Sequence, residues 1–255
     1  MPLQIAGLTK RYGHLTALSE VSFSIRPGEV LGLIGPNGSG KTTLFECLGG
    51  VLPADAGRVL SDGRALSSSG RTATVFYLPD GIAPWPAQTV RWALNFVAGY
   101  FGPQYGASGF SSAEASAKAV SRTSADIVRE LDLEPLLDSA IGTLSKGQRK
   151  RALLAMGLLM PQPVLMADEP FDGLDLRQSR DVAQTLRSYA SAGRTMFLSI
   201  HQIKDAARVC DRFVLLSGGR VCAEGTIEEL AQRANQNLTN RTNHQNLESI
   251  FLALT

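Results

Sequence analysis

Apolar residues fall into short runs along this chain, and glycine, proline or charged residues separate them. Three runs, Val30–Ile34, Val164–Ala167 and Thr195–Ile200, are apolar at most positions, which is typical of strands buried inside a sheet. Leu3–Thr9 and Val21–Ile25 also have the pattern of strands, and the second alternates apolar with polar residues. The pattern predicts an α/β core.

A helical segment is expected between the early and the late strands. Apolar residues recur every three or four positions over Thr89–Val97, and a capping box of Ser111 and Glu114 opens a helix that runs towards Leu131. Residues 81–144 should therefore be mostly helical and inserted between strands of the core.

Turn residues divide the rest of the chain into further short elements. We expect a turn at Lys10–Gly13, strands at Arg58–Leu60 and Thr74–Leu78, a loop at Gly102–Ser112, helices ending at Met160 and spanning Arg177–Ala192, a hairpin of Asp211–Leu216 with Arg220–Glu224, a helix at Thr226–Arg233, a mobile link at Ala234–Gln245 and an amphipathic end at Leu247–Leu254.

Length and composition limit the class of protein. At 255 residues the chain can bury a large core as one or two domains, and its 25 basic and 23 acidic residues nearly balance, which argues against a large nucleic-acid surface. Cys47, Cys210 and Cys222 lack metal-ligand spacing and are expected to be reduced, buried thiols of a cytosolic protein. The longest apolar stretch, Ala152–Met160, is too short to span a membrane, and the first residues show no signal pattern, so we expect a soluble chain.

Candidate chemistry centres on Gly35–Thr43, which joins a buried strand to the start of a helix. Strand, glycine-rich turn and helix form the context in which a phosphate-binding loop works. The glycines allow successive N–H groups to point into one hollow, and the helix start adds its positive dipole end. A glycine-rich turn with an incidental lysine is the alternative, and the match at every fixed position argues against it. The expected phosphate ligands are Gly35, Asn37, Gly38, Ser39, Gly40, Lys41, Thr42 and Thr43.

Four polar residues carry the expected roles in metal binding and catalysis. Lys41 would reach the β- and γ-phosphates, and the Thr42 hydroxyl would bind Mg²⁺. Asp168 and Glu169 follow a buried strand, and ligands bind at the carboxyl ends of parallel strands. Asp168 suits the Mg²⁺ shell, and Glu169 is placed to orient or deprotonate a water. Carboxylates often only cap helices, but a proline follows directly and a phosphate loop is present, which favours catalysis.

Two aromatic rings are further candidates. Tyr12 lies upstream of the phosphate loop, where it is either a half-exposed turn residue or a platform on which a purine stacks. His201 follows the strand Thr195–Ile200, and its place at the carboxyl edge of the sheet favours contact with the γ-phosphate over a structural role.

Taken in order, these segments resemble the ATP-binding subunit of ATP-binding cassette (ABC) transporters over nearly the whole chain. Considered by themselves, Ser145, Gly147 and Gln148 have only the pattern of a helix start. The resemblance implies that they clamp the γ-phosphate of ATP bound to the opposite subunit of a head-to-tail dimer. It rests on an aromatic loop at Tyr12, a Walker A motif at Gly35–Thr43, a signature at Leu144–Gln148, a Walker B motif at Val164–Glu169, a D-loop at Asp172–Asp175 and a switch histidine at His201.

Two residues depart from the family pattern. Lys146 replaces a glycine of the signature and is expected to place a cation near the partner's phosphate. Asp80 stands where the family has a glutamine after a strand. Its carboxylate can accept a Mg²⁺ contact, but when ionised it cannot donate a hydrogen bond to water. Alternatively, Asp80 caps the turn at Gly81 and faces solvent.

The resemblance implies a P-loop NTPase fold of the α/β class, with a RecA-like core, an antiparallel β-subdomain and an inserted helical subdomain at about 81–145. The ATP-binding domain would span 1–225 and a C-terminal helical tail 226–255. ATP and Mg²⁺ are the implied cofactors. The implied catalytic residues are Lys41, Glu169 and His201, and the implied metal ligands are Thr42, Asp80 and Asp168.

The resemblance also implies partners. These are a second copy of the chain or a paralogous ATPase subunit, and a separate transmembrane permease, which would hold the chain on the inner face of the cell membrane. Residues 246–255 are similar to the ends of ATPases that serve exporters. The implied function is hydrolysis of ATP to drive transport, with export as the favoured direction.

Two other classes of ABC protein compete with this interpretation. ATPases of this family that act on DNA or ribosomes usually carry two cassettes or a long coiled-coil insertion, whereas this chain has one cassette and no basic nucleic-acid face. A catalytically idle regulatory subunit is opposed by the intact Lys41, Asp168, Glu169 and His201.

Overall fold

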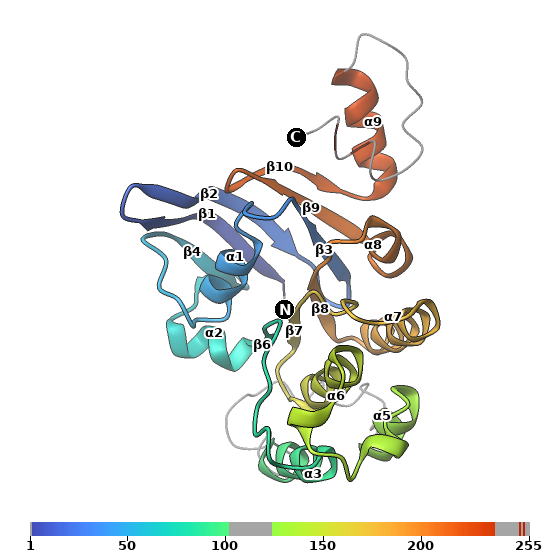
Figure 1. The fold of residues 1–255 in the computed structure, drawn as a ribbon. Coiled ribbons are helices and arrows are strands. Elements are labelled where there is room, and N and C mark those ends of the chain that lie inside the picture. The colour runs from blue at the N-terminus through green and yellow to red at the C-terminus, as the bar shows by residue number, and fades with distance from the viewer. Residues whose placement is uncertain (1, 102–123, 238–249, 251, 253–255) are drawn as a thin grey trace.

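Two β-sheets organise the part of the chain that the computed structural model describes, residues 2–101, 124–237, 250 and 252 (Figure 1). The larger sheet has the strand order β10-β9-β3-β8-β7-β6, and all neighbours in it are parallel except the β9–β10 hairpin. That hairpin confirms the expected one. The strands of this sheet are β3 (Val30–Ile34), β6 (Val75–Leu78), β7 (Val164–Asp168), β8 (Thr195–Ser199), β9 (Arg212–Ser217) and β10 (Arg220–Gly225).

The smaller sheet is antiparallel and has the order β2-β1-β4-β5. Its strands are β1 (Leu3–Tyr12), β2 (Leu15–Ile25), β4 (Ala56–Ser61) and β5 (Arg64–Ala65). The turn expected at Lys10–Gly13 was wrong, because β1 continues to Tyr12 and pairs it with Leu15. A tight connection through Gly13, whose φ is +57°, leaves both strands longer than their apolar patterns suggest.

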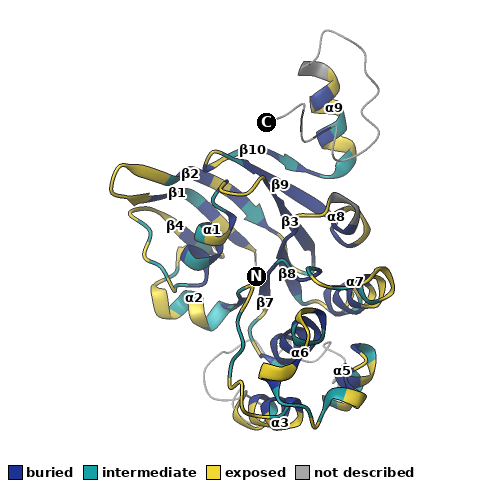
Figure 2. Cartoon of the chain, in the orientation of Figure 1, coloured by how far each residue is buried: buried dark blue, intermediate teal, exposed yellow. Residues whose placement is uncertain are grey.

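Alternate residues of the central strands face two separate cores, which is why these strands are apolar throughout. Leu31 and Leu33 point towards the smaller sheet and α1 (Lys41–Leu48), where the Phe45 and Phe197 ring centroids are 4.8 Å apart. Val30 and Ile34 point towards the helices on the opposite face. Figure 2 shows the central strands almost entirely dark blue. The phosphate loop therefore begins at a strand that is buried on both faces.

Helices pack on the second face of the large sheet. The apolar spacing expected in the helical insertion is confirmed, because Val90, Leu94 and Val97 are buried on α3 against α6. The helix expected to end near Leu131 is present as α5, and its expected capping box lies outside the described residues. The helices are α2 (Ser68–Thr74), α3 (Val90–Phe101), α5 (Ser124–Glu130), α6 (Lys146–Leu159), α7 (Leu176–Ser191), α8 (Ile203–Val209) and α9 (Ile227–Asn237), with 3₁₀ turns at Glu134–Leu136 and Ile141–Thr143.

Two expectations need correction. The helix α9 continues to Asn237, so the mobile link expected from Ala234 begins too early; Ala234 is buried against the core, and the rest of the link lies outside the described residues. Cys47 and Cys210 are buried free thiols, but Cys222 is exposed, because it points outward from the edge strand β10.

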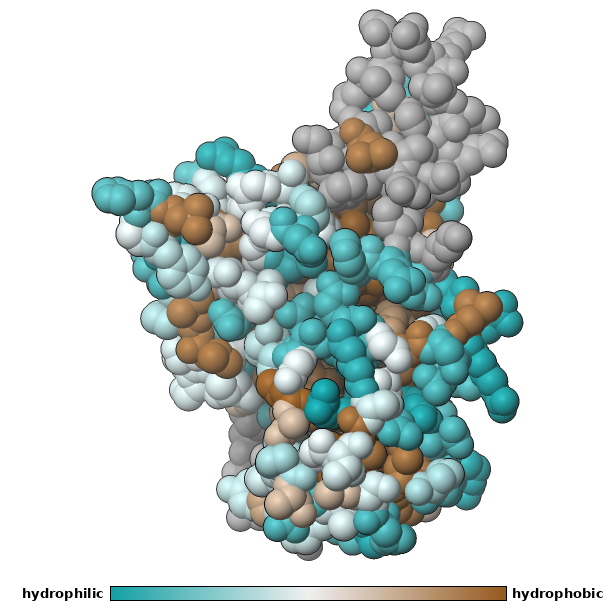
Figure 3. All heavy atoms as spheres, viewed as in Figure 1, coloured by the Kyte–Doolittle hydropathy of each residue, from teal (hydrophilic) through white to brown (hydrophobic). Residues whose placement is uncertain are grey.

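Within the described residues, no helix is long and apolar enough to cross a bilayer. On the face seen in Figure 3, hydrophobic residues form separate small patches among polar ones.

Candidate nucleotide-binding site

Three strands of the large sheet end side by side and carry the candidate site. β8 lies between β3 and β7, and Ser199 on β8 is in register with Leu33 on one side and Asp168 on the other. All three strands are parallel, so their carboxyl ends share one edge of the sheet, where ligands bind in open α/β folds. The phosphate loop, Asp168, Glu169 and His201 all follow directly from this edge.

Glycines let the phosphate loop close tightly. A Cβ atom on Gly35 would lie 2.3 Å from the carbonyl oxygen of Leu216, and one on Gly40 would lie 2.6 Å from the carbonyl oxygen of Ala17. Gly40 also has a φ of +102° and caps α1 without any side-chain hydrogen bond, which leaves the first N–H groups of the helix available to a ligand. The loop therefore forms an open cradle of backbone donors.

Two polar side chains within this loop are buried. The Lys41 ammonium donates to the carbonyl oxygens of Gly35 at 2.8 Å and Pro36 at 3.3 Å, so it lies folded against the loop. The hydroxyl of Ser39 is buried and has no hydrogen-bond partner among the described residues. A buried hydroxyl without a partner is costly, and the oxygens of a phosphate would satisfy it. The cradle thus fits the phosphate chain of a nucleotide.

Asp168 joins the phosphate loop to the neighbouring strands. Its Oδ2 accepts a hydrogen bond from the Thr42 hydroxyl at 3.0 Å, and its Oδ1 accepts one from the Ser199 hydroxyl. Oxygen ligands of this kind, a carboxylate beside a hydroxyl, are those that Mg²⁺ prefers next to substrate phosphates. The structure thus brings Thr42 and Asp168 together, in an arrangement that fits Mg²⁺.

Glu169 occupies an unusual backbone conformation. Its φ is +50°, a left-handed value that residues other than glycine rarely adopt. Its N–H donates to the carbonyl oxygen of Ser199 at 3.1 Å. The carboxylate accepts a hydrogen bond from the N–H of His201 at 3.2 Å. Burial raises the pKa of Glu169, against the opposing effect of the Lys41 charge. A raised pKa suits a carboxylate that takes a proton from water.

A cavity of about 270 Å³ brings residues from four motifs together. Asn37 of the phosphate loop, Glu169 and the exposed His201 all line it. Asp172 of the expected D-loop and Ser199 contribute as well. The cavity therefore adjoins the phosphate loop and offers space for groups beside a bound phosphate.

Asp80 follows β6 and lies near the same edge of the sheet. Its Oδ1 accepts a 2.6 Å bond from the Lys150 ammonium, which also donates to the main-chain oxygen of Asp168 at 3.2 Å. Burial tends to raise the pKa of Asp80, but the bond and the charge of Lys150 outweigh it and lower that pKa. The Asp80 carboxylate is therefore neither a simple cap of Gly81 nor an unpaired metal ligand.

Tyr12 lies apart from these groups. Its side chain is exposed at the end of β1, and the Lys10 ammonium is 5.6 Å from the centroid of its ring. An exposed ring at the end of a hairpin leaves one face available for stacking. In the described part of the chain, no hydrogen bond joins the Tyr12 side chain to the phosphate loop.

The signature segment forms the start of α6. Ser145 is the N-cap, and its side chain and that of Gln148 form a capping box. A Cβ atom on Gly147 would lie 2.4 Å from the carbonyl oxygen of Gly173, so this glycine permits close contact with the D-loop. Lys146 forms an ion pair with Asp172 of the same chain, whereas we expected it near a partner's phosphate. Among the described residues, no hydrogen bond links the signature to the phosphate loop.

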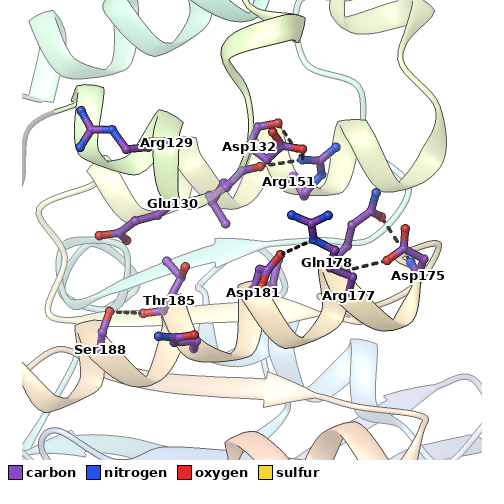
Figure 4. Close-up of a pocket in the computed structure, with 13 residues that line it drawn as sticks. Arg129, Glu130, Asp132, Arg151, Asp175, Arg177, Gln178, Asp181, Thr185 and Ser188 are labelled. Atoms are coloured by element: carbon purple, nitrogen blue, oxygen red, sulfur yellow. Dashed lines mark hydrogen bonds and ion pairs between the residues drawn. The ribbon is translucent and has the colours of Figure 1, made fainter.

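A larger cavity, of about 740 Å³, lies between α5, α6 and α7 (Figure 4). Its lining mixes both signs of charge, including Arg129, Asp132, Arg151 and Arg177. The guanidinium of Arg151 is already bound to the Leu131 and Asp132 carbonyl oxygens. None of the expected site residues lines this cavity, so it is separate from the phosphate loop.

Two residues of this site were missed from the sequence. The apolar pattern predicts Ser199 only as part of a strand, although a small polar residue two positions before His201 is a usable signal. Lys150 lies in the basic run Arg149–Arg151, which in the sequence has the pattern of a solvated face, yet it is 4% exposed. Its partner is 70 positions away, which no local pattern reveals.

Comparison with known proteins agrees with this geometry. Residues 18–172 match the family described as ABC transporter. The chain is 34% identical over 233 residues to a Nod factor export ATP-binding protein I of Burkholderia orbicola, covering 91% of this chain and 73% of that protein. A solved ATP-binding subunit of an ABC transporter superposes with a TM-score of 0.80 at 26% identity, covering 100% of this chain and 99% of that one. A bacterial Atm1-family ABC exporter with ATP bound gives a TM-score of 0.71 at 26% identity, over 91% of this chain and 40% of that one.

The family match extends from β2 through the phosphate loop and the signature helix to the D-loop, and the solved relatives have the P-loop NTPase fold expected from the motifs. The chain therefore belongs to the ABC transporter family, in which it is an ATP-binding and ATP-hydrolysing subunit.

Proposed function

We propose that this chain binds MgATP, pairs with a second copy of itself or a paralogous ATPase subunit around two nucleotides, and hydrolyses them to drive export through a separate transmembrane permease. The observation that carries the proposal is the meeting of Lys41, Thr42, Asp168 and Glu169 at one edge of the parallel sheet. The export names among the relatives support the direction of transport, and such a permease would hold the chain at the inner face of the membrane.

The proposed mechanism assigns each residue a separate task. Lys41 would leave the carbonyl oxygens of its own loop and bind the β- and γ-phosphates, while Ser39 and the N–H groups at the start of α1 hold the rest of the phosphate chain. Mg²⁺, when bound, would neutralise phosphate charge. Thr42 and Asp168 would hold it, with Asp80 as the neighbouring acidic group.

The water that attacks the γ-phosphate would be held between Glu169 and His201, which line one cavity. Glu169 would accept its proton, because burial raises the affinity of this carboxylate for protons. The signature residues Ser145, Gly147 and Gln148 would complete the site of the partner subunit. The exposed Tyr12 ring would stack on the adenine.

The substitution Glu169→Gln tests the central role in this proposal. The parent protein should hydrolyse MgATP, and the variant should lose turnover by about 10²–10⁴-fold, because general-base catalysis contributes about that much. Its affinity for a fluorescent ATP analogue should stay within about twofold of the parent, since the phosphate cradle is intact. Glu20→Gln is the matched control, because Glu20 also has a left-handed φ, of +54°, but is an exposed residue in the middle of β2. A Glu169→Gln protein that turns over at the parent rate removes Glu169 from the mechanism.

A second experiment tests the transport role. The tagged chain, expressed in its native cells and purified in mild detergent, should retain one multi-spanning membrane protein, and the pair in lipid vesicles should hydrolyse ATP faster than the chain alone. Recovery with ribosomes or DNA, and no stimulation by a membrane protein, would instead support the class of ABC ATPases that do not transport.

A further inference from the structure

Lys150 is a buried cation that joins three elements of the fold. It lies in the first half of α6 and is 4% exposed. Its ammonium donates to Asp80 after β6, at 2.6 Å, and to the main-chain oxygen of Asp168 at the end of β7, at 3.2 Å. The Asp80 carboxylate oxygen and the Asp168 carbonyl oxygen therefore lie no farther apart than these two bonds laid end to end.

Burying a lysine ammonium is costly unless it is paired, so its two partners are fixed where they can satisfy it. One partner is the main-chain oxygen of Asp168, whose side chain accepts a hydrogen bond from the Thr42 hydroxyl. The other partner, Asp80, has a side chain that is 36% exposed and would be mobile without a fixed counter-charge. Lys150 therefore ties an acidic side chain to the strand end that carries Asp168.

We propose that Lys150 is a positioning residue of the magnesium–nucleotide site: it holds the Asp80 carboxylate and the carboxyl end of β7 in the arrangement that Mg²⁺ binding requires. This inference rests on the proposed function. Together the Lys150 ammonium and the Asp80 carboxylate carry no net charge. Because they are bonded to each other, the pair can occupy the loop after β6 in the place of a single neutral side chain. Lys150 also belongs to the helix that begins with Ser145, so the same contact sets the signature helix against the metal-site strand.

The neighbouring residue on α6 offers an internal comparison. Arg151 is 6% exposed, and its guanidinium donates to the carbonyl oxygens of Leu131 at 2.8 Å and Asp132 at 2.7 Å. It also pairs with the Asp132 carboxylate at 3.2 Å. Arg151 is thus a second buried cation with carbonyl and carboxylate partners, but those partners lie at the end of α5, away from the strand ends. It matches Lys150 in burial and in bonding and differs in location.

The test is a Mg²⁺ titration of nucleotide binding, read as the fluorescence of an ATP analogue at fixed concentration, with thermal unfolding measured in parallel. Lys150→Met and Arg151→Met should both lower the melting temperature, because each leaves a carboxylate and carbonyl oxygens without their donor. Only Lys150→Met should raise the Mg²⁺ concentration at half-saturation, by about tenfold, as the loss of groups that orient metal ligands commonly does. Arg151→Met should stay within about twofold of the parent.

The double variant Asp80→Asn with Lys150→Met separates positioning from stability. It removes both charges together, so its melting temperature should recover towards the parent, while its Mg²⁺ midpoint should stay raised. A midpoint that recovers with stability would make the pair purely structural and overturn the inference. An unchanged or lower midpoint in Lys150→Met would also overturn it. If the parent itself binds no nucleotide at any Mg²⁺ concentration, the proposed function fails, and this inference fails with it.

Discussion

At Glu169 the backbone conformation and the burial of the side chain act together. The backbone of Glu169 has a left-handed φ of +50°, and its carboxylate, which accepts a hydrogen bond from the N–H of His201, lines the cavity. A residue other than glycine in the left-handed backbone conformation costs conformational energy, and such residues are concentrated at functional sites. Burial, which raises the pKa of this carboxyl, adds a second cost at neutral pH. Both costs are consistent with a residue retained for chemistry.

The raised pKa makes a prediction about stability. A carboxyl whose pKa is raised by folding costs stability when it is ionised; the cost is complete above the raised pKa and is lost as the pH falls to the ordinary value of 4.5. Glu169→Gln avoids this cost, so without nucleotide it should melt about 1–3 °C higher than the parent at pH 8. The difference should vanish near pH 4.5. A Glu169→Gln variant that melts below the parent at pH 8 would contradict this account.

Tyr12 supports a prediction about nucleotide affinity. A ring stacked on the base holds the ground state and the transition state alike, and such stacking is worth about 1–3 kcal/mol. Tyr12→Ala should therefore raise KM for ATP by about 5-fold or more and leave kcat nearly unchanged, whereas Tyr12→Phe should match the parent. Steady-state kinetics in saturating Mg²⁺ measure both constants. Equal KM values for Tyr12→Ala and the parent would remove the stacking role.

Some residues of this site could be predicted from the sequence and others could not, for a physical reason. Lys41 and Thr42 belong to one contiguous loop whose backbone geometry demands glycines at defined positions, so the motif itself carries the information. Lys150 owes its role to a partner 70 positions away, brought to it by sheet register and by the docking of α6. In the sequence it looks like one more residue of a basic run.

The start of α6 shows how a helix terminus can have two uses. Ser145 and Gln148 satisfy the first N–H groups of their own helix through a capping box, and Ser145 is exposed beside the D-loop. The helix α9 has a similar arrangement far from the site, because Thr226 accepts from the N–H of Glu229 at 3.3 Å and the Glu229 carboxylate accepts from the N–H of Thr226 at 2.9 Å. The two caps therefore form a matched pair for testing.

Ser145→Ala and Thr226→Ala should each lower stability by about 1 kcal/mol, the usual contribution of an N-cap. Only Ser145→Ala should also lower ATP turnover, by about tenfold or more, because the same hydroxyl is expected to bind the partner's γ-phosphate. Denaturant unfolding measures the first effect and steady-state hydrolysis the second. If the two variants lose turnover equally, the signature serine is a helix cap and nothing more.

At the scale of elements, apolar periodicity was a good guide where an element is buried and a poor one where it is not. The strands β3, β7 and β8 are buried on both faces, and their runs were identified within a residue or two. The helix α2 was missed, since it buries none of its residues and depends on a local cap in which Ser67 accepts from the N–H of Gly70. A pattern of hydrophobic positions cannot reveal an element that has no hydrophobic face.

At the scale of the whole molecule, the arrangement of the motif residues bears on how the chain would assemble. The phosphate loop, Asp168 and Glu169 lie at the carboxyl edge of the large sheet, whereas no hydrogen bond joins Ser145 or Gln148 to that loop anywhere in the described ranges. Lys146 meanwhile pairs with Asp172 of its own D-loop. An exposed serine at a helix start that forms no hydrogen bond to the phosphate loop of its own chain is suited to contact a second copy, in which each chain would supply what the other lacks.

Glu169→Gln gives this idea its test at the molecular scale, because a site that binds MgATP without hydrolysing it should hold two chains together. The variant should elute as a monomer without nucleotide and as a dimer with MgATP in size-exclusion chromatography with light scattering. ADP should leave it monomeric, since the γ-phosphate is the group that both chains would contact. Adding Ser145→Ala should reduce the dimer fraction, whereas adding Thr226→Ala should not, although both lose the same kind of cap. A variant that binds MgATP tightly and remains a monomer would show that the two halves of the motif set do not meet across subunits, and that hydrolysis in this chain is completed by another partner.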